Sequence, residues 1–173
     1  MQQLLMRRPN LENLPDAADL PAGYMLRDGH EEDIPRLATV LGAAFLNTDW
    51  TSEEAHKSLI ADASVKRIFV IECDGALVAT ASSRLLPNVY PDSGYVHWVG
   101  VDPAHQGRRL GYSVTLATLT DFAARGCRDA VLETDDFRIP AIKTYLKLGF
   151  TPVYRDETHR ERWDKINKVI GDW

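Results

Sequence analysis

The chain has 173 residues, of which 45% are hydrophobic and 26% are charged. This length and apolar content predict one globular domain that can bury a core without disulfides or metals. Twenty Lys and Arg residues against 25 Asp and Glu residues give a net charge of −5. That balance disfavours nucleic acid as a partner, because phosphate backbones are bound by basic surfaces. No apolar run approaches the roughly 20 residues that cross a bilayer, so we expect no membrane partner.

Cysteine usage points away from disulfides and metal sites. The two cysteines, Cys73 and Cys127, form no C-x-x-C pair and no His/Cys metal spacing, and both adjoin apolar runs. We therefore expect ordinary reduced thiols and no metal. The first eight residues lack the pattern of a signal peptide, which favours a cytoplasmic location.

Prolines and polar residues dominate the start of the chain. Three of the nine prolines lie there, at Pro9, Pro15 and Pro21. This composition predicts an irregular N-terminal arm over residues 1–22 and a single domain over residues 23–173.

Periodicity and turn residues divide that domain into eleven elements. They are a strand (23–27), two helices (31–44 and 51–61), a hairpin of strands (68–73 and 77–86) around Asp74-Gly75, a strand (95–101), a long helix (110–125) ended by Gly126, a strand (130–134), a short helix (140–148) ended by Gly149, and two closing strands (from 150, then to about 165) around a turn at Asp156-Glu157. The order β-α-α-β-β-β-α-β-α-β-β predicts a mixed α/β domain.

A strand-to-helix turn over residues 99–111 is the most informative stretch. The first N–H groups of a helix lack partners and lie at the positive end of its dipole, which suits a phosphate or pyrophosphate. Gly107 and Gly111 let the backbone approach a ligand, and Arg108 and Arg109 next to His105 add local positive charge. The alternative, without any binding role, is an ordinary helix start with solvated arginines. The Walker and Rossmann glycine loops are both absent.

Two motifs resemble the GCN5-related N-acetyltransferase (GNAT) family. Gln106-x-x-Arg109-x-Gly111 is similar to that family's acyl-CoA loop, [QR]-x-x-G-x-[GA], with Arg109 in place of the middle glycine. Residues 141–150, AIKTYLKLGF, match A-x-x-x-Y-x-x-x-G-F, although Arg138 stands where many members have Asn. The resemblance covers roughly residues 23–165 and implies the acyl-CoA N-acyltransferase fold, a mostly antiparallel mixed sheet flanked by helices.

The resemblance also implies acetyl-CoA as co-substrate. It would lie between the strand at Val99 and the strand near Glu133, with the Val99 N–H polarising the thioester and the pyrophosphate on the turn. The implied binding residues are Val99, Gly100, Val101, Gln106, Gly107, Arg108, Arg109, Leu110, Gly111, Tyr112, Ala141 and Tyr145.

Tyr145 is the candidate general acid. A phenol with a pKa of about 10 is protonated at pH 7 and can donate to a leaving thiolate. By residue type alone it would be a helix tyrosine packed on the core, and the family motif favours the catalytic role.

His97 and Glu133 are rival candidates for the general base. Because side chains of a strand alternate between its two faces, we expect one face to carry Tyr95, His97, Val99 and Val101. A histidine such as His97 can titrate near neutrality, and Glu133 lies on the neighbouring strand. A core histidine and a structural carboxylate are the equally open alternatives.

The resemblance implies that the acceptor is a primary amine of a small molecule or a protein, and no residue pattern selects among them. The resemblance implies that the acceptor enters beside residues 45–50 and 154–163, where Asp49, Asp156 and Glu157 could attract an amine and Trp50 or Tyr90 could stack on it. A homodimer is left open. The alternative function is a non-catalytic acyl-CoA-binding or sensing module.

Overall fold

A computed structural model describes residues 2–17, 19–46 and 49–171. It contains one seven-stranded sheet with the strand order β2-β3-β4-β5-β6-β1-β7, in which every neighbouring pair is antiparallel except β5 and β6. The strands are β1 (Leu4–Arg8), β2 (Tyr24–Asp28), β3 (Val65–Cys73), β4 (Ala76–Leu85), β5 (Ser93–Val101), β6 (Asp129–Thr134) and β7 (Thr151–Val153). The helices are α1 (Ile34–Ala44), α2 (Ser52–Leu59), α3 (Leu110–Ala124), α4 (Ile139–Lys147) and α5 (Glu157–Ile170), with short 3₁₀ turns at Glu31–Asp33 and Pro103–His105. The mixed, mostly antiparallel fold predicted from the sequence is confirmed.

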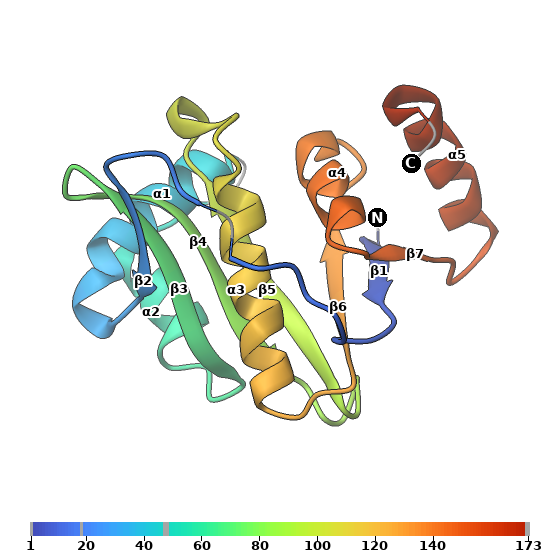
Figure 1. Cartoon of the computed structure of the whole chain (residues 1–173), viewed down its shortest axis with the longest axis horizontal. Coiled ribbons are helices and arrows are strands. Elements are labelled where there is room, and N and C mark those ends of the chain that lie inside the picture. The colour runs from blue at the N-terminus through green and yellow to red at the C-terminus, as the bar shows by residue number, and fades with distance from the viewer. Residues whose placement is uncertain (1, 18, 47–48, 172–173) are drawn as a thin grey trace.

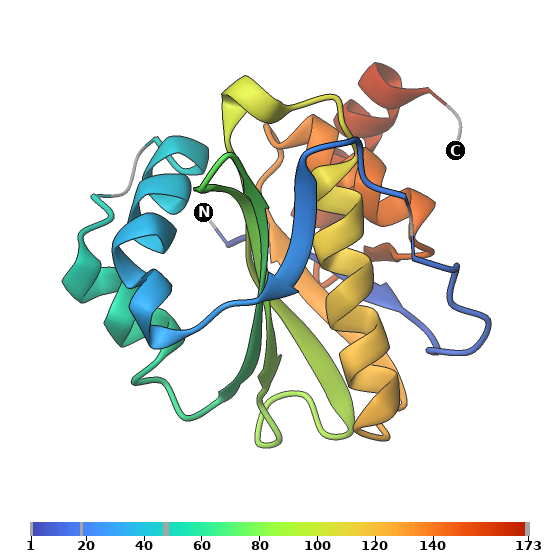
Figure 2. The ribbon, with the colours of Figure 1, turned by 60° about the vertical axis from the view of Figure 1, so that its left-hand side comes forward.

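Helices cover both faces of the sheet. Figure 2 shows α1 and α2 on one face and α3 on the other. The apolar stripe predicted for the first helix is buried against the sheet through Ile34, Leu37, Val40 and Leu41. The predicted hairpin turn also forms, with φ of 50° at Asp74 and 79° at Gly75, as a two-residue type I′ turn requires.

The prediction of an irregular N-terminal arm is wrong for its first residues. Residues 4–8 form β1, which pairs with β6 on one side and β7 on the other. Leu4 and Met6 are completely buried, so this short apolar run is part of the core. The described parts of the following segment, residues 9–17 and 19–23, lead past α3 to the far edge of the sheet, where β2 begins (Figure 1).

The last predicted strand is also wrong, because residues 157–170 form the helix α5. Its buried positions His159, Trp163 and Ile166 recur every three or four residues, which is a helical period. Asp156, predicted as part of a turn, is the N-cap residue, and its carboxylate accepts a hydrogen bond from the His159 N–H at 3.1 Å.

The sheet splits between its two parallel strands. β5 and β6 pair only over Ser93–Tyr95 and Asp129–Val131, and Figure 1 shows them diverging beyond that point. A cleft at this split is where both motifs of the sequence meet.

A β-bulge in β5 changes which side chains face that cleft. Ser82 pairs with His97 but Thr80 pairs with Gly100, so β5 has one extra residue, and Trp98 has a φ of +46°. Trp98 packs with Phe45 on the α1 face, whereas Val99 and Val101 pack on the α3 face. The predicted common face of Tyr95, His97, Val99 and Val101 is therefore wrong beyond His97.

Candidate active site

Two cavities meet at the split in the sheet. The large cavity has a volume of about 880 Å³ and extends from the turn before α3 to the loop between β6 and α4. The small cavity, of about 160 Å³, lies beside β5 and β6. Both are lined by Phe45, Val99, Asp135, Arg138 and Tyr145, which we call the junction residues.

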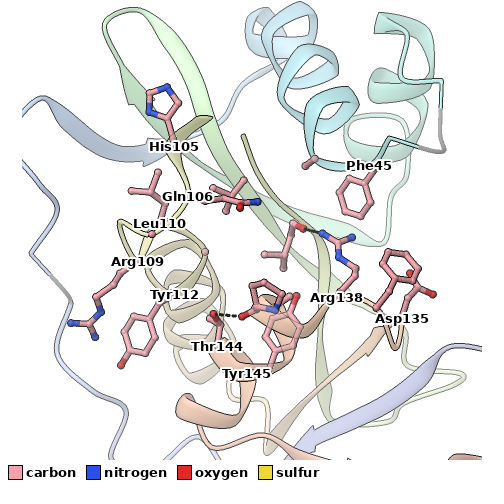
Figure 3. A pocket seen from close by; sticks show the side chains of 18 of the residues that line it. Phe45, His105, Gln106, Arg109, Leu110, Tyr112, Asp135, Arg138, Thr144 and Tyr145 are labelled. Carbon is pink, nitrogen blue, oxygen red and sulfur yellow. Dashed lines mark hydrogen bonds between the residues drawn. The ribbon is translucent and has the colours of Figure 1, made fainter. Parts of the chain in front are cut away.

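The turn before α3 forms one end of the large cavity. Among the described residues no side chain caps α3, so its first N–H groups are left for a ligand. Arg109, which replaces the family's glycine, has a φ of 59° and so takes the left-handed conformation that glycine adopts freely. Its guanidinium stacks 4.7 Å from the ring centre of Tyr112 (Figure 3). The substitution thus keeps the backbone path of the turn and adds a cation.

A hydrogen bond from outside the loop braces this turn. The Tyr24 hydroxyl lies 2.9 Å from Nδ1 of His105, joining the edge strand β2 to the 3₁₀ turn. Arg108 points its guanidinium back at the carbonyls of Ala104 and Gln106, at 3.4 and 3.2 Å. Both sets of contacts favour this conformation of the loop.

Ten of the twelve predicted donor-binding residues line the large cavity. They are Val99, Val101, Gln106, Gly107, Arg109, Leu110, Gly111, Tyr112, Ala141 and Tyr145. Arg108 is turned to the backbone carbonyls just described. Gly100 faces α1 instead, where an added Cβ would lie 3.1 Å from the Cβ of Ala44, so its role is close packing.

Tyr145 projects from α4 into the junction (Figure 3). Its side chain is 5% exposed and lies edge-on to Phe150, with ring centres 6.0 Å apart. Burial raises the pKa of Tyr145 to about 12, so the phenol keeps its proton at neutral pH.

His97 and Glu133 both line the small cavity, with Tyr145. Burial lowers the pKa of His97 to about 4, so the imidazole is neutral at pH 7 and a weak base. Glu133 accepts a hydrogen bond from the Tyr95 hydroxyl at 3.2 Å and forms an ion pair with Arg155. The structure therefore brings the three catalytic candidates to one cavity, although each rival base carries a constraint.

The acceptor-side candidates are mostly engaged in structure. Asp156 caps α5, Glu157 lies 3.6 Å from Arg160, and Tyr90 stacks on Tyr95. Trp50 packs at right angles to Trp98, with ring centres 4.7 Å apart.

Arg138 and Asp135 are the junction residues that sequence reasoning passed over as functional groups. The Arg138 guanidinium donates to the Val99 carbonyl at 3.3 Å and lies 4.1 Å from the ring centre of Phe45 (Figure 3). The replacement of the family's Asn by Arg138 was the one sequence signal that could have indicated a functional role for this arginine. Asp135 accepts a hydrogen bond from the Gln3 amide at 3.2 Å.

Comparison with known proteins agrees with this geometry. Residues 34–150 match the model of the acetyltransferase (GNAT) family, so the chain belongs to that family. A mycothiol acetyltransferase of Actinosynnema mirum is 33% identical over 161 residues, covering 87% of this chain and 52% of that protein. The chain thus spans about half the length of this relative.

Solved structures share the fold. A GCN5-related N-acetyltransferase from Sphaerobacter thermophilus superposes with a TM-score of 0.66 at 19% identity, covering 88% of this chain and 50% of that one. The ribosomal-protein-S18-alanine N-acetyltransferase from Escherichia coli gives 0.64 at 19% identity, covering 76% and 79%.

The described residues lack two further kinds of feature. No helix among them is long and apolar enough to span a membrane. No group of three or more His, Cys, Asp and Glu side chains in the same part of the chain could hold a metal ion.

Proposed function

We propose that this protein is an acetyl-CoA-dependent N-acetyltransferase that moves an acetyl group to a primary amine by direct attack on the thioester. The observation that carries the proposal is the continuous cavity, which joins an uncapped, arginine-bearing helix start to a protonated Tyr145 at the split in the sheet. Family membership over residues 34–150 supports acetyl transfer as the reaction class.

The donor would bind along the large cavity. Its pyrophosphate would lie on residues 106–111, where helix N–H groups and Arg109 supply positive charge. The pantetheine arm would run along the unpaired side of β5, beside Val99 and Val101, as an added strand does. The Val99 N–H is our candidate for stabilising the oxyanion.

The chemistry needs one proton to leave the amine and one to reach sulfur. The amine nitrogen forms a bond to the acetyl carbon, the carbon–sulfur bond breaks, and the thiolate takes the Tyr145 proton. The amine proton leaves through the small cavity, which His97 and Glu133 line. Because the pKa of His97 is about 4, we propose that the fraction of the amine that is already neutral, set by the acceptor's own pKa, attacks the thioester. The proton that its nitrogen loses after the attack passes to solvent water, and the Tyr145 phenolate regains a proton from solvent, with Glu133 holding Arg155 and Tyr95 in place.

Replacing Tyr145 with Phe tests the proposal. Loss of a positioned general acid costs about 10²- to 10⁴-fold in rate, so we expect kcat to fall by that order while the Kd for acetyl-CoA stays within about twofold. The measurements are CoA-thiol release on a panel of amines and calorimetric titration with acetyl-CoA. An unchanged kcat would remove Tyr145 from the mechanism.

A non-catalytic acyl-CoA sensor is the alternative, because the acyl-CoA loop departs from the family pattern at Arg109 and Arg138 stands in place of Asn. A sensor would bind acetyl-CoA yet release no CoA thiol with any amine of the panel. The left-handed Arg109 preserves the turn, and the protonated Tyr145 lies at the junction. Both observations favour the enzyme.

We further propose a soluble, cytoplasmic protein that acts without a metal.

A further inference from the structure

Arg138 is an arginine without a carboxylate partner at the centre of the candidate site. Among the described residues no carboxylate oxygen lies within 4 Å of its guanidinium, whereas Arg84 in the small cavity pairs with Asp62 at 3.0 Å. One Nη2–H contacts the Val99 carbonyl, and a guanidinium has five N–H donors. Arg138 therefore has donors to spare in a half-buried position.

Asp135 is its counterpart of opposite charge. It lines both cavities, and no cation of the described residues lies within 4 Å of its carboxylate, Arg138 included. A neighbouring acid and base that form no ion pair with each other are complementary to a molecule that carries both charges. Such a molecule brings an ammonium for Asp135 and a carboxylate for Arg138.

Apolar side chains accompany this pair. Phe45 underlies the Arg138 guanidinium, and Leu46 and Phe137, the chain neighbours of Phe45 and Arg138, also line the large cavity with 85% and 75% of their surfaces exposed. Large exposed apolar side chains beside a cavity are typical of a ligand contact. An apolar substituent of the acceptor would lie against them.

We propose that the acceptor is a small amino acid-like molecule with an apolar side chain, whose carboxylate binds Arg138 and whose amine is delivered to the junction past Asp135. This inference rests on the proposed acetyl transfer and assigns Arg138 as a specificity-determining residue. A carboxylate on the acyl donor is the other source of the same chemistry. We favour the acceptor because Leu46 and Phe137, which would contact its apolar substituent, are the two exposed large apolar side chains among the residues that line the large cavity.

The test compares L-phenylalanine with 2-phenylethylamine, which lacks only the carboxylate, as acceptors for the full chain with acetyl-CoA. A lost charge-assisted hydrogen bond corresponds to about a tenfold to hundredfold change. We expect the kcat/KM for phenylalanine, divided by that for 2-phenylethylamine, to fall by that factor in Arg138→Met relative to the unchanged chain. Comparing this ratio between the two proteins cancels the different basicities of the amines. Arg138→Lys should keep part of the preference, because a point charge replaces the fork.

Two matched variants sharpen the result. Arg128→Met removes a largely exposed arginine outside both cavities and should leave the ratio unchanged. Asp135→Asn should raise KM for both acceptors alike, since both bring an ammonium. An identical ratio in Arg138→Met and the unchanged chain would overturn the proposal. A preference for malonyl-CoA over acetyl-CoA that Arg138→Met abolishes would also overturn it, by assigning the guanidinium to the donor.

Failure of the proposed acetyl transfer can be told apart from failure of the Arg138 proposal. If no amine releases CoA thiol while acetyl-CoA binds, the acetyl transfer fails, and calorimetry then decides the inference. Titration of both acceptors into the CoA-saturated chain should show tighter binding of phenylalanine, by tenfold or more, that Arg138→Met removes. Equal affinities in that titration would contradict the role of Arg138.

Discussion

At the scale of single residues, burial decides what each titratable group at the junction can do. The same desolvation that keeps Tyr145 protonated makes His97 a weak base, because burial disfavours the charged form of either side chain. The buried phenol always carries a proton at neutral pH, and its raised pKa also makes it a weaker acid than an exposed phenol. A buried neutral imidazole is poorly suited to taking a proton from an ammonium.

This difference predicts the pH dependence of the reaction. His97 has lost its proton well below pH 6, so between pH 6 and 9 kcat/KM should rise tenfold per pH unit up to the pKa of the acceptor amine. Profiles measured with two acceptors of different pKa should therefore have acidic limbs that follow the acceptor. His97→Ala should leave those limbs in place, as should the control His56→Ala in the half-exposed α2 position. A limb near pH 6.5 that is shared by both acceptors and disappears in His97→Ala would restore His97 as the base.

At the scale of elements, most of the fold could be predicted because its signals are local. The hairpin at Asp74-Gly75, the helix ended by Gly126 and the apolar stripe of α1 each follow from a few neighbouring residues. The bulge at Trp98 has no such signal, since it depends on how β4 pairs with β5. It moved Val99 and Val101 to the opposite face from His97, which changed the predicted site more than any other element.

The ends of the chain were mispredicted for a related reason. Leu4 to Met6 is a short apolar run among polar neighbours, and its burial depends on pairing with β6 and β7, more than 120 residues away. At the other end, the spacing of His159, Trp163 and Ile166 was the available signal for α5. Asp156 was predicted as a turn residue, although the same residue type is favoured at helix N-caps.

The central position of β1 predicts a large cost for shortening one of its core side chains. Met6 is completely buried between strands and helices, so Met6→Ala should lower the free energy of unfolding by about 2–5 kcal/mol. The control Gln2→Ala, at an exposed position beside the strand, should change it by less than about 0.5 kcal/mol. Urea denaturation of both variants measures the difference. Equal small effects would mean that the segment is a dispensable arm after all.

At the scale of the whole molecule, the net charge of −5 is unevenly distributed. Arginines such as Arg27, Arg67 and Arg162 are held in ion pairs with carboxylates. The two arginines that line the large cavity, Arg109 and Arg138, have no carboxylate partner among the described residues. An acidic protein with two such arginines lining one cavity is suited to an anionic ligand there.

That distribution predicts a selective stabilisation of the folded chain by its donor. A ligand that binds only the native state at 100 times its Kd adds about 2.7 kcal/mol of stability, which for a domain of this size raises Tm by roughly 5–10 °C. We expect that shift with acetyl-CoA and with CoA, because both carry the pyrophosphate that residues 106–111 would hold. ATP and NAD lack the pantetheine arm that would pair with β5, so at the same concentration they should shift Tm by less than about 2 °C. Equal shifts with all four compounds would mean that the turn binds phosphate groups in general, and the cavity along Val99 and Val101 would then have no part in recognising the donor.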